Sequence, residues 1–423
     1  MKLSTSPPLL GRITIPGDKS ISHRGVILGA ISTGTTVIHN FLHSQDCHST
    51  IDCFRKMGVK IQVEDDTVTV HGQGLDGLRA PAETLYAGNS GTTMRLMAGL
   101  LAAQGFSIRL TGDESLSARP MNRVITPLEI MGAKIESNNG YAPLNIFGAR
   151  LSGINYTLPV ASAQLKSALI LAGLYANGQT VITQPVVCRD HTEVMLTAFG
   201  AGLETSGAKI TITPGKQPAG CEFEVPGDIS SAAFFIVAAL IVPGSQILIK
   251  NVGINKTRTG IIDVLLRMGA DIKIQNVRTR VEQVGDILVT HSPLTGTYVG
   301  GAEIPLLIDE IPIIAVAAAF AKGHTVIADA AELKVKETNR IDTTATELAK
   351  AGADITPTAD GMVINGGNAV HGAKFSSYGD HRIAMAMSVL ALAAQEDSFI
   401  ENARAADVSF PTFYTLLREL GRG

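Results

Sequence analysis

The sequence predicts a mixed α/β protein of two similar domains, each containing three βαβαββ modules. Its 423 residues suit two or three domains better than a single core. A glycine that ends a helical stretch recurs along the chain. Two Pro-Gly-Asp segments, Ile15–Asp18 and Val225–Asp228, have nearly the same residues and mark a division into halves. These three observations define the expected fold class.

The recurring glycines follow apolar helical stretches and precede a strand, as in Met131-Gly-Ala-Lys-Ile135. Glycine just past the last helical turn is the expected left-handed cap. The spacing of 68 to 83 residues is too long for a solenoid repeat and predicts compact modules. The capping glycines are Gly58, Gly132, Gly200, Gly269 and Gly352.

Short strands are expected after small-residue turns, and each module is expected to read helix, strand, helix, strand, strand. Alternating apolar residues in Val59–Val63 and Val68–Val70 predict a hairpin. A sixth strand, at Asp397–Ile400, ends the series without a following helix and hairpin. The predicted domains are 1–17 plus 227–423, and 18–226, with the N-terminal segment packed against the C-terminal half. The turns open at Gly34, Gly105, Gly178, Gly244 and Gly323.

Composition narrows the class of protein. Apolar residues make up 45% and charged residues 17%, which excludes intrinsic disorder, a disulfide-stapled miniprotein and a collagenous fibre. The longest apolar stretches, Ala232–Val242 and Ile311–Ala321, fall short of the ~20 residues of a spanning helix and predict buried helices. With no signal-peptide stretch and four cysteines in no CxxC pair, we expect a cytoplasmic protein with free thiols.

Charge and helix starts together indicate local anion binding. The net charge of −3 gives no global attraction to nucleic acid. Each module opens a helix with small, polar or charged residues, and a helix N-terminus presents free N–H groups and partial positive charge. Any one such start can be a structural cap, but Lys19, Arg24, Arg95 and Arg119 near these starts favour phosphate or carboxylate binding. The starts are 17–24, 88–95, 161–166, 227–232, 307–312 and 377–382.

Two acidic residues have alternative interpretations. A helix over Lys334–Arg340 would place Glu337 between Lys336 and Arg340, either as a solvated helix start or as an acid between two cations. Asp309 either caps the apolar helix that follows it or acts as a general base in a dry site.

Cofactor motifs are missing. A P-loop ending at Gly17–Ser20 would need glycine in place of Ile13 and Asp18, and no GxGxxG opens a module. The Asp-His pairs at 190–191 and 380–381 form no defined metal ligand set. We therefore expect neither a cofactor nor a metal.

Taken together, six motifs resemble the enolpyruvyl transferase family, and within it the EPSP synthases, over essentially the whole chain. The resemblance implies domains that are inside-out α/β barrels, with hinge closure over an interdomain cleft. It implies transfer of the enolpyruvyl group of phosphoenolpyruvate to the 5-hydroxyl of shikimate 3-phosphate through a tetrahedral intermediate, with release of phosphate. That reaction belongs to the shikimate pathway, which leads to chorismate and the aromatic amino acids. The motifs are Pro16–Arg24, Gly88–Arg95, Leu110–Asp113 with Ala118–Pro120, Ser162–Gln164, Val335–Arg340 and Gly379–Arg382.

The resemblance also implies residue roles. Glu337 is the candidate proton donor and Asp309 the candidate base, with Lys336 and Lys19 as the other catalytic candidates. Shikimate 3-phosphate would be held by Lys19, Ser20, Arg24, Ser162, Ala163, Gln164, Arg189, Asp309 and Lys336. Phosphoenolpyruvate would be held by Lys19, Asn89, Gly91, Arg95, Arg119, Gln164, Arg340 and Arg382.

Two alternatives remain open. The sister enzyme that transfers enolpyruvyl to UDP-N-acetylglucosamine has Asn after its first-module Lys, where this chain has Ser20, and usually a Cys in the loop that is Cys-free here at Asp113–Ser117. A non-catalytic anion-binding relative would have lost Glu337, Asp309 or Lys19, and all three are present. The expected partners are small anionic substrates only, with no nucleic acid and no membrane, and the protein is expected to be a monomer.

Overall fold

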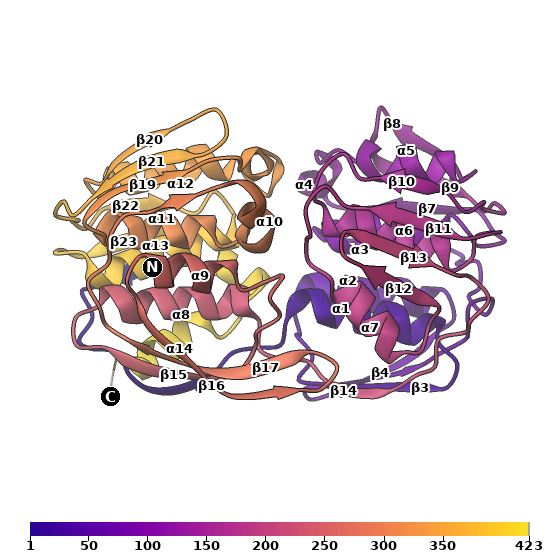
Figure 1. Cartoon of the computed structure of the whole chain (residues 1–423), viewed down its shortest axis with the longest axis horizontal. Coiled ribbons are helices and arrows are strands. Elements are labelled where there is room, and N and C mark those ends of the chain that lie inside the picture. Colours follow the sequence, from indigo (N-terminus) through magenta and orange to yellow (C-terminus); the bar gives the residue numbers. More distant parts are fainter. Residues whose placement is uncertain (422–423) are drawn as a thin grey trace. The chain divides into compact units, whose positions relative to one another are not determined.

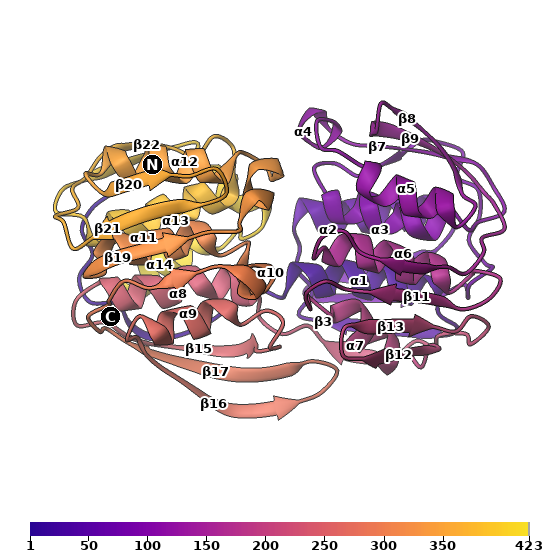
Figure 2. The same ribbon diagram turned by 45° about the horizontal axis from the view of Figure 1, so that its top comes forward.

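Apolar helices occupy the centre of each of the two units into which the chain divides, and β-sheets lie outside them (Figures 1 and 2). The computed structural model describes residues 1–421. Unit 1 comprises Met1–Pro16, Pro226–Thr279 and Gln283–Gly423; unit 2 comprises Gly17–Val225 and Arg280–Glu282. The tip of one long hairpin, residues 280–282, therefore belongs to a different unit from the strands on either side of it.

Unit 2 contains three helix-strand modules in succession. Its elements in chain order are α1 (Lys19–Ile31), β3 (Thr35–His39), α2 (Gln45–Lys56), β4 (Lys60–Glu64), β5 (Thr67–His71), β6 (Leu85–Tyr86), α3 (Gly91–Leu101), β7 (Ile108–Thr111), α4 (Glu114–Ser117), α5 (Asn122–Ile130), β8 (Lys134–Asn138), β9 (Tyr141–Phe147), β10 (Asn155–Thr157), α6 (Ala163–Gly173), β11 (Thr180–Thr183), α7 (His191–Ala198), β12 (Leu203–Ser206), β13 (Lys209–Ile212) and β14 (Glu222–Glu224).

Unit 1 begins with two N-terminal strands and continues after Val225. Its elements are β1 (Lys2–Leu3), β2 (Leu10–Thr14), α8 (Ile229–Ile241), β15 (Gln246–Gly253), α9 (Gly260–Arg267), β16 (Asp271–Thr279), β17 (Gln283–Thr290), β18 (Tyr298–Val299), η1 (Gly301–Glu303), α10 (Ile304–Leu307), α11 (Ile311–Phe320), β19 (Gly323–Ile327), η2 (Ala331–Val335), α12 (Arg340–Lys350), β20 (Asp354–Pro357), β21 (Met362–Gly366), β22 (Lys374–Ser376), α13 (His381–Ala393), β23 (Ser398–Glu401), η3 (Ala403–Val408) and α14 (Phe413–Leu420).

The sheets share one topology. In each four-stranded sheet an opening strand pairs parallel with the next strand, and a hairpin completes the sheet antiparallel, as in β6-β7-β9-β8. The chain passes from one unit to the other after Pro16 and after Val225. The strand before each of these points pairs parallel with a strand far away in the sequence: β2 pairs with β15 in unit 1, and β14 pairs with β3 in unit 2. The sixth module lacks the hairpin, as the sequence predicts, and β1 takes the antiparallel place beside β23.

The predicted helix ends at glycine are confirmed. All five capping glycines have positive φ, from 73° at Gly200 to 101° at Gly132, and each follows a helix that ends two residues before it. The predicted hairpin is β4 with β5. A left-handed residue costs glycine little, so these positions end the helices sharply and turn the chain into the following strand.

The central helices of unit 1 are buried on every side. Every residue of α8 is buried, and α8, α11 and α13 pack against one another. Alanines on these helices allow the helices to approach one another closely. In the same core the Phe413 ring packs edge-on against Phe235 and Phe410, whose own rings are tilted to each other. This confirms that the two long apolar stretches are buried helices. Among residues 1–421, no helix is both long and apolar enough to cross a membrane.

Candidate active site

All six predicted helix starts are real. The helices begin at Lys19, Gly91 and Ala163 in unit 2, and at Ile229, Ile311 and His381 in unit 1. Five of them have a side-chain cap that accepts a backbone N–H, for example Asp18 Oδ1 from Ile21 N at 2.9 Å. A cap satisfies only part of the free N–H set of a helix N-terminus, so the remaining groups still favour an anion.

The start of α1 brings together three predicted shikimate 3-phosphate residues. Arg189 Nη1 donates to Ser20 Oγ at 2.6 Å, although the two residues are 169 positions apart in the chain. Lys19 Nζ lies 3.3 Å from Asp46 Oδ2 on α2. This ion pair is partly buried, so the carboxylate holds the ammonium group close to the helix start.

Arg24 is buried and held by hydroxyl groups. Its Nε donates to Thr192 Oγ1 at 2.6 Å and its Nη2 to Ser167 Oγ at 2.8 Å. The two hydroxyls are themselves 2.6 Å apart, and Arg24 Nη1 donates to the carbonyl of Ser20 at 3.1 Å. This cage fixes the guanidinium plane, which matters for paired hydrogen bonds to a phosphate. Sequence reasoning missed Thr192 and Ser167, which carry no charge or motif of their own.

At the start of α3, the guanidinium groups of two arginines lie close to Gly91. A Cβ on Gly91 would lie 2.8 Å from Arg95 Nη1 and 3.6 Å from Arg119 Nη1, so the missing side chain leaves room for both guanidinium groups. Arg119 Nη2 donates to Asn89 Oδ1 at 2.7 Å. Asn89 Nδ2 donates to Asp113 Oδ2 at 2.8 Å, which fixes the orientation of the Asn89 amide. Four of the predicted phosphoenolpyruvate residues, Asn89, Gly91, Arg95 and Arg119, therefore lie together.

The start of α6 joins this group through Gln164. Arg95 Nη1 donates to Gln164 Oε1 at 2.7 Å, and Gln164 Nε2 donates to Thr92 Oγ1 at 3.1 Å. Ser162 caps the helix by accepting from Leu165 N at 3.4 Å, and Ala163 is its first residue. Gln164 is thus placed where the two predicted ligand sets of unit 2 meet.

Unit 1 gathers three cations around Asp309. Its carboxylate oxygens lie 3.2 Å from Lys336 Nζ, 3.5 Å from Arg340 Nη1 and 4.0 Å from Arg382 Nη2. Glu337 Oε2 lies 2.6 Å from Arg340 Nη2. All five predicted site residues of unit 1 therefore belong to one cluster.

The structure contradicts the expected helix over Lys334–Arg340 and one of the two alternatives for Asp309. Lys334–Arg340 is not one helical face: η2 ends at Val335, Lys336 is extended, and α12 begins only at Arg340 behind the cap Asn339. Asp309 does not cap α11, whose start has no side-chain cap bond. Its carboxylate instead lies close to cations from α12, α13 and the loop before α12.

Asp380 organises the arginines of this cluster. It accepts from Arg340 Nε at 2.8 Å and Nη2 at 3.2 Å, and it caps α13 by accepting from Arg382 N at 2.8 Å. Burial alone would raise the pKa of Asp380, but the charge of Arg340, the charge of His381 and the hydrogen bond from Arg340 together outweigh burial and hold that pKa below its usual range. Burial would likewise lower the pKa of Arg340, but Asp380 and Glu337 raise it, so the guanidinium stays charged. The sequence placed Asp380 in a helix start, in an Asp-His pair and in the motif Gly379–Arg382, but gave it no role of its own.

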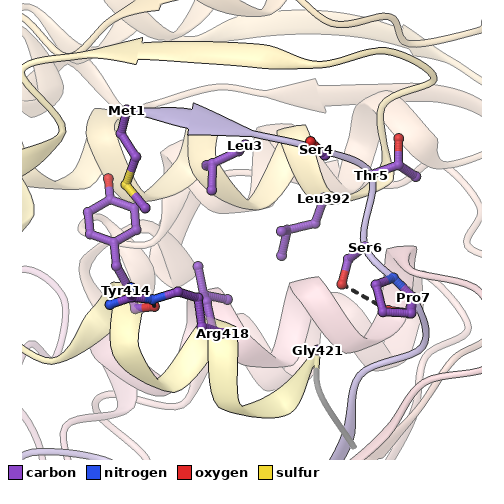
Figure 3. A pocket seen from close by; sticks show the side chains of 11 residues that line it. Met1, Leu3, Ser4, Thr5, Ser6, Pro7, Leu392, Tyr414, Arg418 and Gly421 are labelled. Atoms are coloured by element: carbon purple, nitrogen blue, oxygen red, sulfur yellow. Dashed lines mark hydrogen bonds between the residues drawn. The ribbon is translucent and has the colours of Figure 1, made fainter.

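Two hollows in the structure lie outside these clusters. One of about 260 Å³ lies between the N-terminal segment and α14, where Tyr414 and Arg418 face Met1–Pro7 (Figure 3). The other, of about 510 Å³, lies in unit 2 beside α7 and is partly lined by Glu193, whose carboxylate pairs with the fully buried Lys166 at 2.6 Å. No predicted site residue lines either hollow.

The chain shares its fold with a solved enolpyruvyl transferase. The structure of the enolpyruvyl transferase NikO from Streptomyces tendae covers 99% of this chain and 97% of its own, with a TM-score of 0.81. The sequences are 19% identical, so this likeness concerns the fold alone.

Sequence comparison defines the family within that class. The family model described as EPSP synthase (3-phosphoshikimate 1-carboxyvinyltransferase) matches residues 3–417, and the chain belongs to this family. A curated 3-phosphoshikimate 1-carboxyvinyltransferase from Brevibacillus brevis is 52% identical over the full length of both chains. The solved EPSP synthase from Acinetobacter baumannii is 45% identical, with a TM-score of 0.89 over 99% of this chain and 97% of its own.

Proposed function

We propose that this protein transfers the enolpyruvyl group of phosphoenolpyruvate to the 5-hydroxyl group of shikimate 3-phosphate and releases phosphate. The observation that carries the proposal is the family match over residues 3–417. The clusters around the starts of α1, α3 and α6, and around Asp309, support it because both substrates are anions. The residue assignments made from the resemblance are kept as proposals.

The unit 1 cluster suits the first chemical step. Glu337 delivers a proton to the methylene carbon of phosphoenolpyruvate, and the 5-hydroxyl oxygen attacks the adjacent carbon while Asp309 takes the hydroxyl proton. The bond from that carbon to the phosphate oxygen then breaks, and the leaving phosphate takes the proton held by Asp309. The Glu337 carboxylate takes back one methyl proton, which restores the double bond. Arg340 Nη2 lies 2.6 Å from Glu337 Oε2 and holds the carboxyl group in position.

Arg95 provides a test of the proposed phosphoenolpyruvate site. Replacing Arg95 by Ala removes a guanidinium group held 2.7 Å from Gln164 and is expected to raise the KM for phosphoenolpyruvate by about tenfold or more, since a hydrogen bond to a charged group is worth about 1.5–3 kcal/mol. The measurement is steady-state kinetics with each substrate varied in turn. Arg109→Ala, on the exposed side of β7, is the matched control and leaves that KM unchanged. An unchanged KM in Arg95→Ala removes Arg95 from the site.

The function itself is tested by phosphate release. Release is expected only when phosphoenolpyruvate and shikimate 3-phosphate are both present, and it is expected to continue with a chelator because arginine and lysine side chains bind both anions. UDP-N-acetylglucosamine in place of shikimate 3-phosphate is expected to give none. Release with that acceptor identifies the sister activity, and no release with either acceptor identifies a non-catalytic relative.

We also propose that the protein acts as a monomer in the cytoplasm, with small molecules as its only partners, as the family resemblance implies. The net charge of −3 gives no global attraction to nucleic acid. Size-exclusion chromatography at several protein concentrations tests the monomer.

A further inference from the structure

A chain of buried hydrogen bonds connects three helices of unit 2. His23 Nδ1 on α1 lies 2.7 Å from Thr50 Oγ1 on α2, which lies 2.7 Å from Thr93 Oγ1 on α3. Thr93 Oγ1 donates to Ser90 Oγ, the N-cap of α3, at 2.7 Å. All four side chains are at most 1% exposed. None of them belongs to the ligand or catalytic sets described above.

The direction of each bond in this chain can be assigned. Ser90 Oγ accepts from both Thr93 N and Thr93 Oγ1, so the single hydroxyl proton of Thr93 is used there. Thr93 must then accept from Thr50, and Thr50 must accept from His23. His23 therefore carries a proton on Nδ1. Burial, and then the charges of Lys19 and Arg24, lower the pKa of His23 to about 3, which agrees with the neutral form.

One end of this chain lies within the first turns of α1, and the other end is the N-cap of α3. His23 lies between Lys19 and Arg24, and Ser90 lies between Asn89 and Gly91. His23 Nε2 has no partner among the described residues, so His23 is joined to the network through Nδ1 alone. Buried hydrogen bonds of this kind favour one arrangement of the elements that they join, because breaking one leaves a polar group unpaired in a dry interior and costs free energy. The spacing of the two helix starts is thereby fixed at the residues proposed to bind phosphoenolpyruvate.

We propose that the chain His23–Thr50–Thr93–Ser90 is a positioning network that sets the start of α1 against the start of α3 for phosphoenolpyruvate binding. The proposal rests on the function proposed above. The four residues act through Asn89 and Gly91, which are proposed ligands of phosphoenolpyruvate only, and they touch no substrate. Shikimate 3-phosphate depends less on the network, because its proposed ligands Ser20, Arg24 and Arg189 are held by a separate set of contacts.

Thr50→Val is the direct test, since valine keeps the shape of threonine but neither donates nor accepts. We expect a KM for phosphoenolpyruvate at least fivefold higher, with the KM for shikimate 3-phosphate changed by less than twofold. Thr50→Ser restores the hydroxyl and is expected to restore the KM. Thr36→Val is the matched control: Thr36 is also a fully buried threonine of unit 2, but its hydroxyl has no partner among the described residues. If Thr50→Val is too unstable to assay, Thr93→Val breaks the same network from α3 and is expected to give the same selective change.

The tautomer of His23 provides a readout that does not depend on activity. Nitrogen-15 spectra of the histidine-labelled, full-length protein are expected to show His23 protonated on Nδ1 and not on Nε2, with loss of this signature in Thr50→Val and retention in Thr36→Val. An Nε2–H tautomer, equal changes in both KM values, or an unchanged phosphoenolpyruvate KM in a folded Thr50→Val protein would overturn the proposal. Failure of the proposed function would appear instead as a wild-type protein without turnover, with the His23 signature intact.

Discussion

Replacing Glu337 by Gln is expected to lower kcat by about 100- to 10,000-fold, the usual contribution of a general acid. Glutamine keeps the size of the side chain and can still accept from Arg340 Nη2, which lies 2.6 Å from the carboxylate. It cannot deliver a proton to the methylene carbon of phosphoenolpyruvate. Both KM values are therefore expected to stay within about threefold, because a loss confined to the transition state leaves ground-state binding intact.

The matched control for this prediction is Glu332→Gln. Glu332 lies five residues earlier, in η2, and has no proposed role. The control is expected to keep wild-type kcat. A kcat for Glu337→Gln within tenfold of wild type would assign the proton transfer to another residue.

Replacing Asp380 by Asn is expected to lower the free energy of unfolding by about 3–5 kcal/mol, the range for breaking a buried ion pair by removing one partner. The Arg340 side chain is 1% exposed and that of Asp380 is 0% exposed. With asparagine, the buried Arg340 guanidinium loses the negative charge of Asp380. The cap of α13 is also weakened, because a neutral amide oxygen replaces a carboxylate. Denaturant unfolding measures the loss. The KM for phosphoenolpyruvate is expected to rise as well, because both Arg340 and Arg382 lose an anchor.

The same substitution is expected to change the pH dependence of stability. Because the pKa of Asp380 is held low in the folded protein, its contribution is present above the unfolded pKa of about 3.9 and is lost as pH falls through the folded value. Wild-type stability is therefore expected to fall more steeply than that of Asp380→Asn below about pH 4. Asp397→Asn, which breaks the exposed pair with Lys2, is the control and leaves the unfolding midpoint unchanged. Equal stability of Asp380→Asn and wild type would contradict the structural role of the pair.

Much of the fold could be predicted because its signals are local. A glycine after the last helical turn, such as Gly132 or Gly269, ends a helix wherever it occurs, and small polar residues start the next one. The two Pro-Gly-Asp segments predicted that the N-terminal segment packs against the C-terminal half. They did not identify its partner strand, because β2 and β15 pair across more than 230 positions. No pattern in the sequence indicated that residues 280–282 belong to unit 2.

The candidate site was predicted where charge or a motif identified it. Arg95, Arg119 and Arg340 fall into clusters as expected. The segment before Arg340 was misassigned because Lys336 and Arg340 have helical spacing, whereas Asn339 starts a new helix between them. Residues that hold others in place, such as Thr192 or His23, could not be found, because a buried hydroxyl or imidazole has the same one-dimensional pattern whether it packs or connects.

The most direct measurement is mass spectrometry of the reaction products formed from shikimate 3-phosphate and phosphoenolpyruvate in heavy water. Protonation of the methylene carbon predicts an enolpyruvyl ether that carries deuterium at that carbon, formed together with an equal amount of phosphate. Phosphate released without the ether, or an ether without deuterium, would contradict transfer by proton addition followed by elimination.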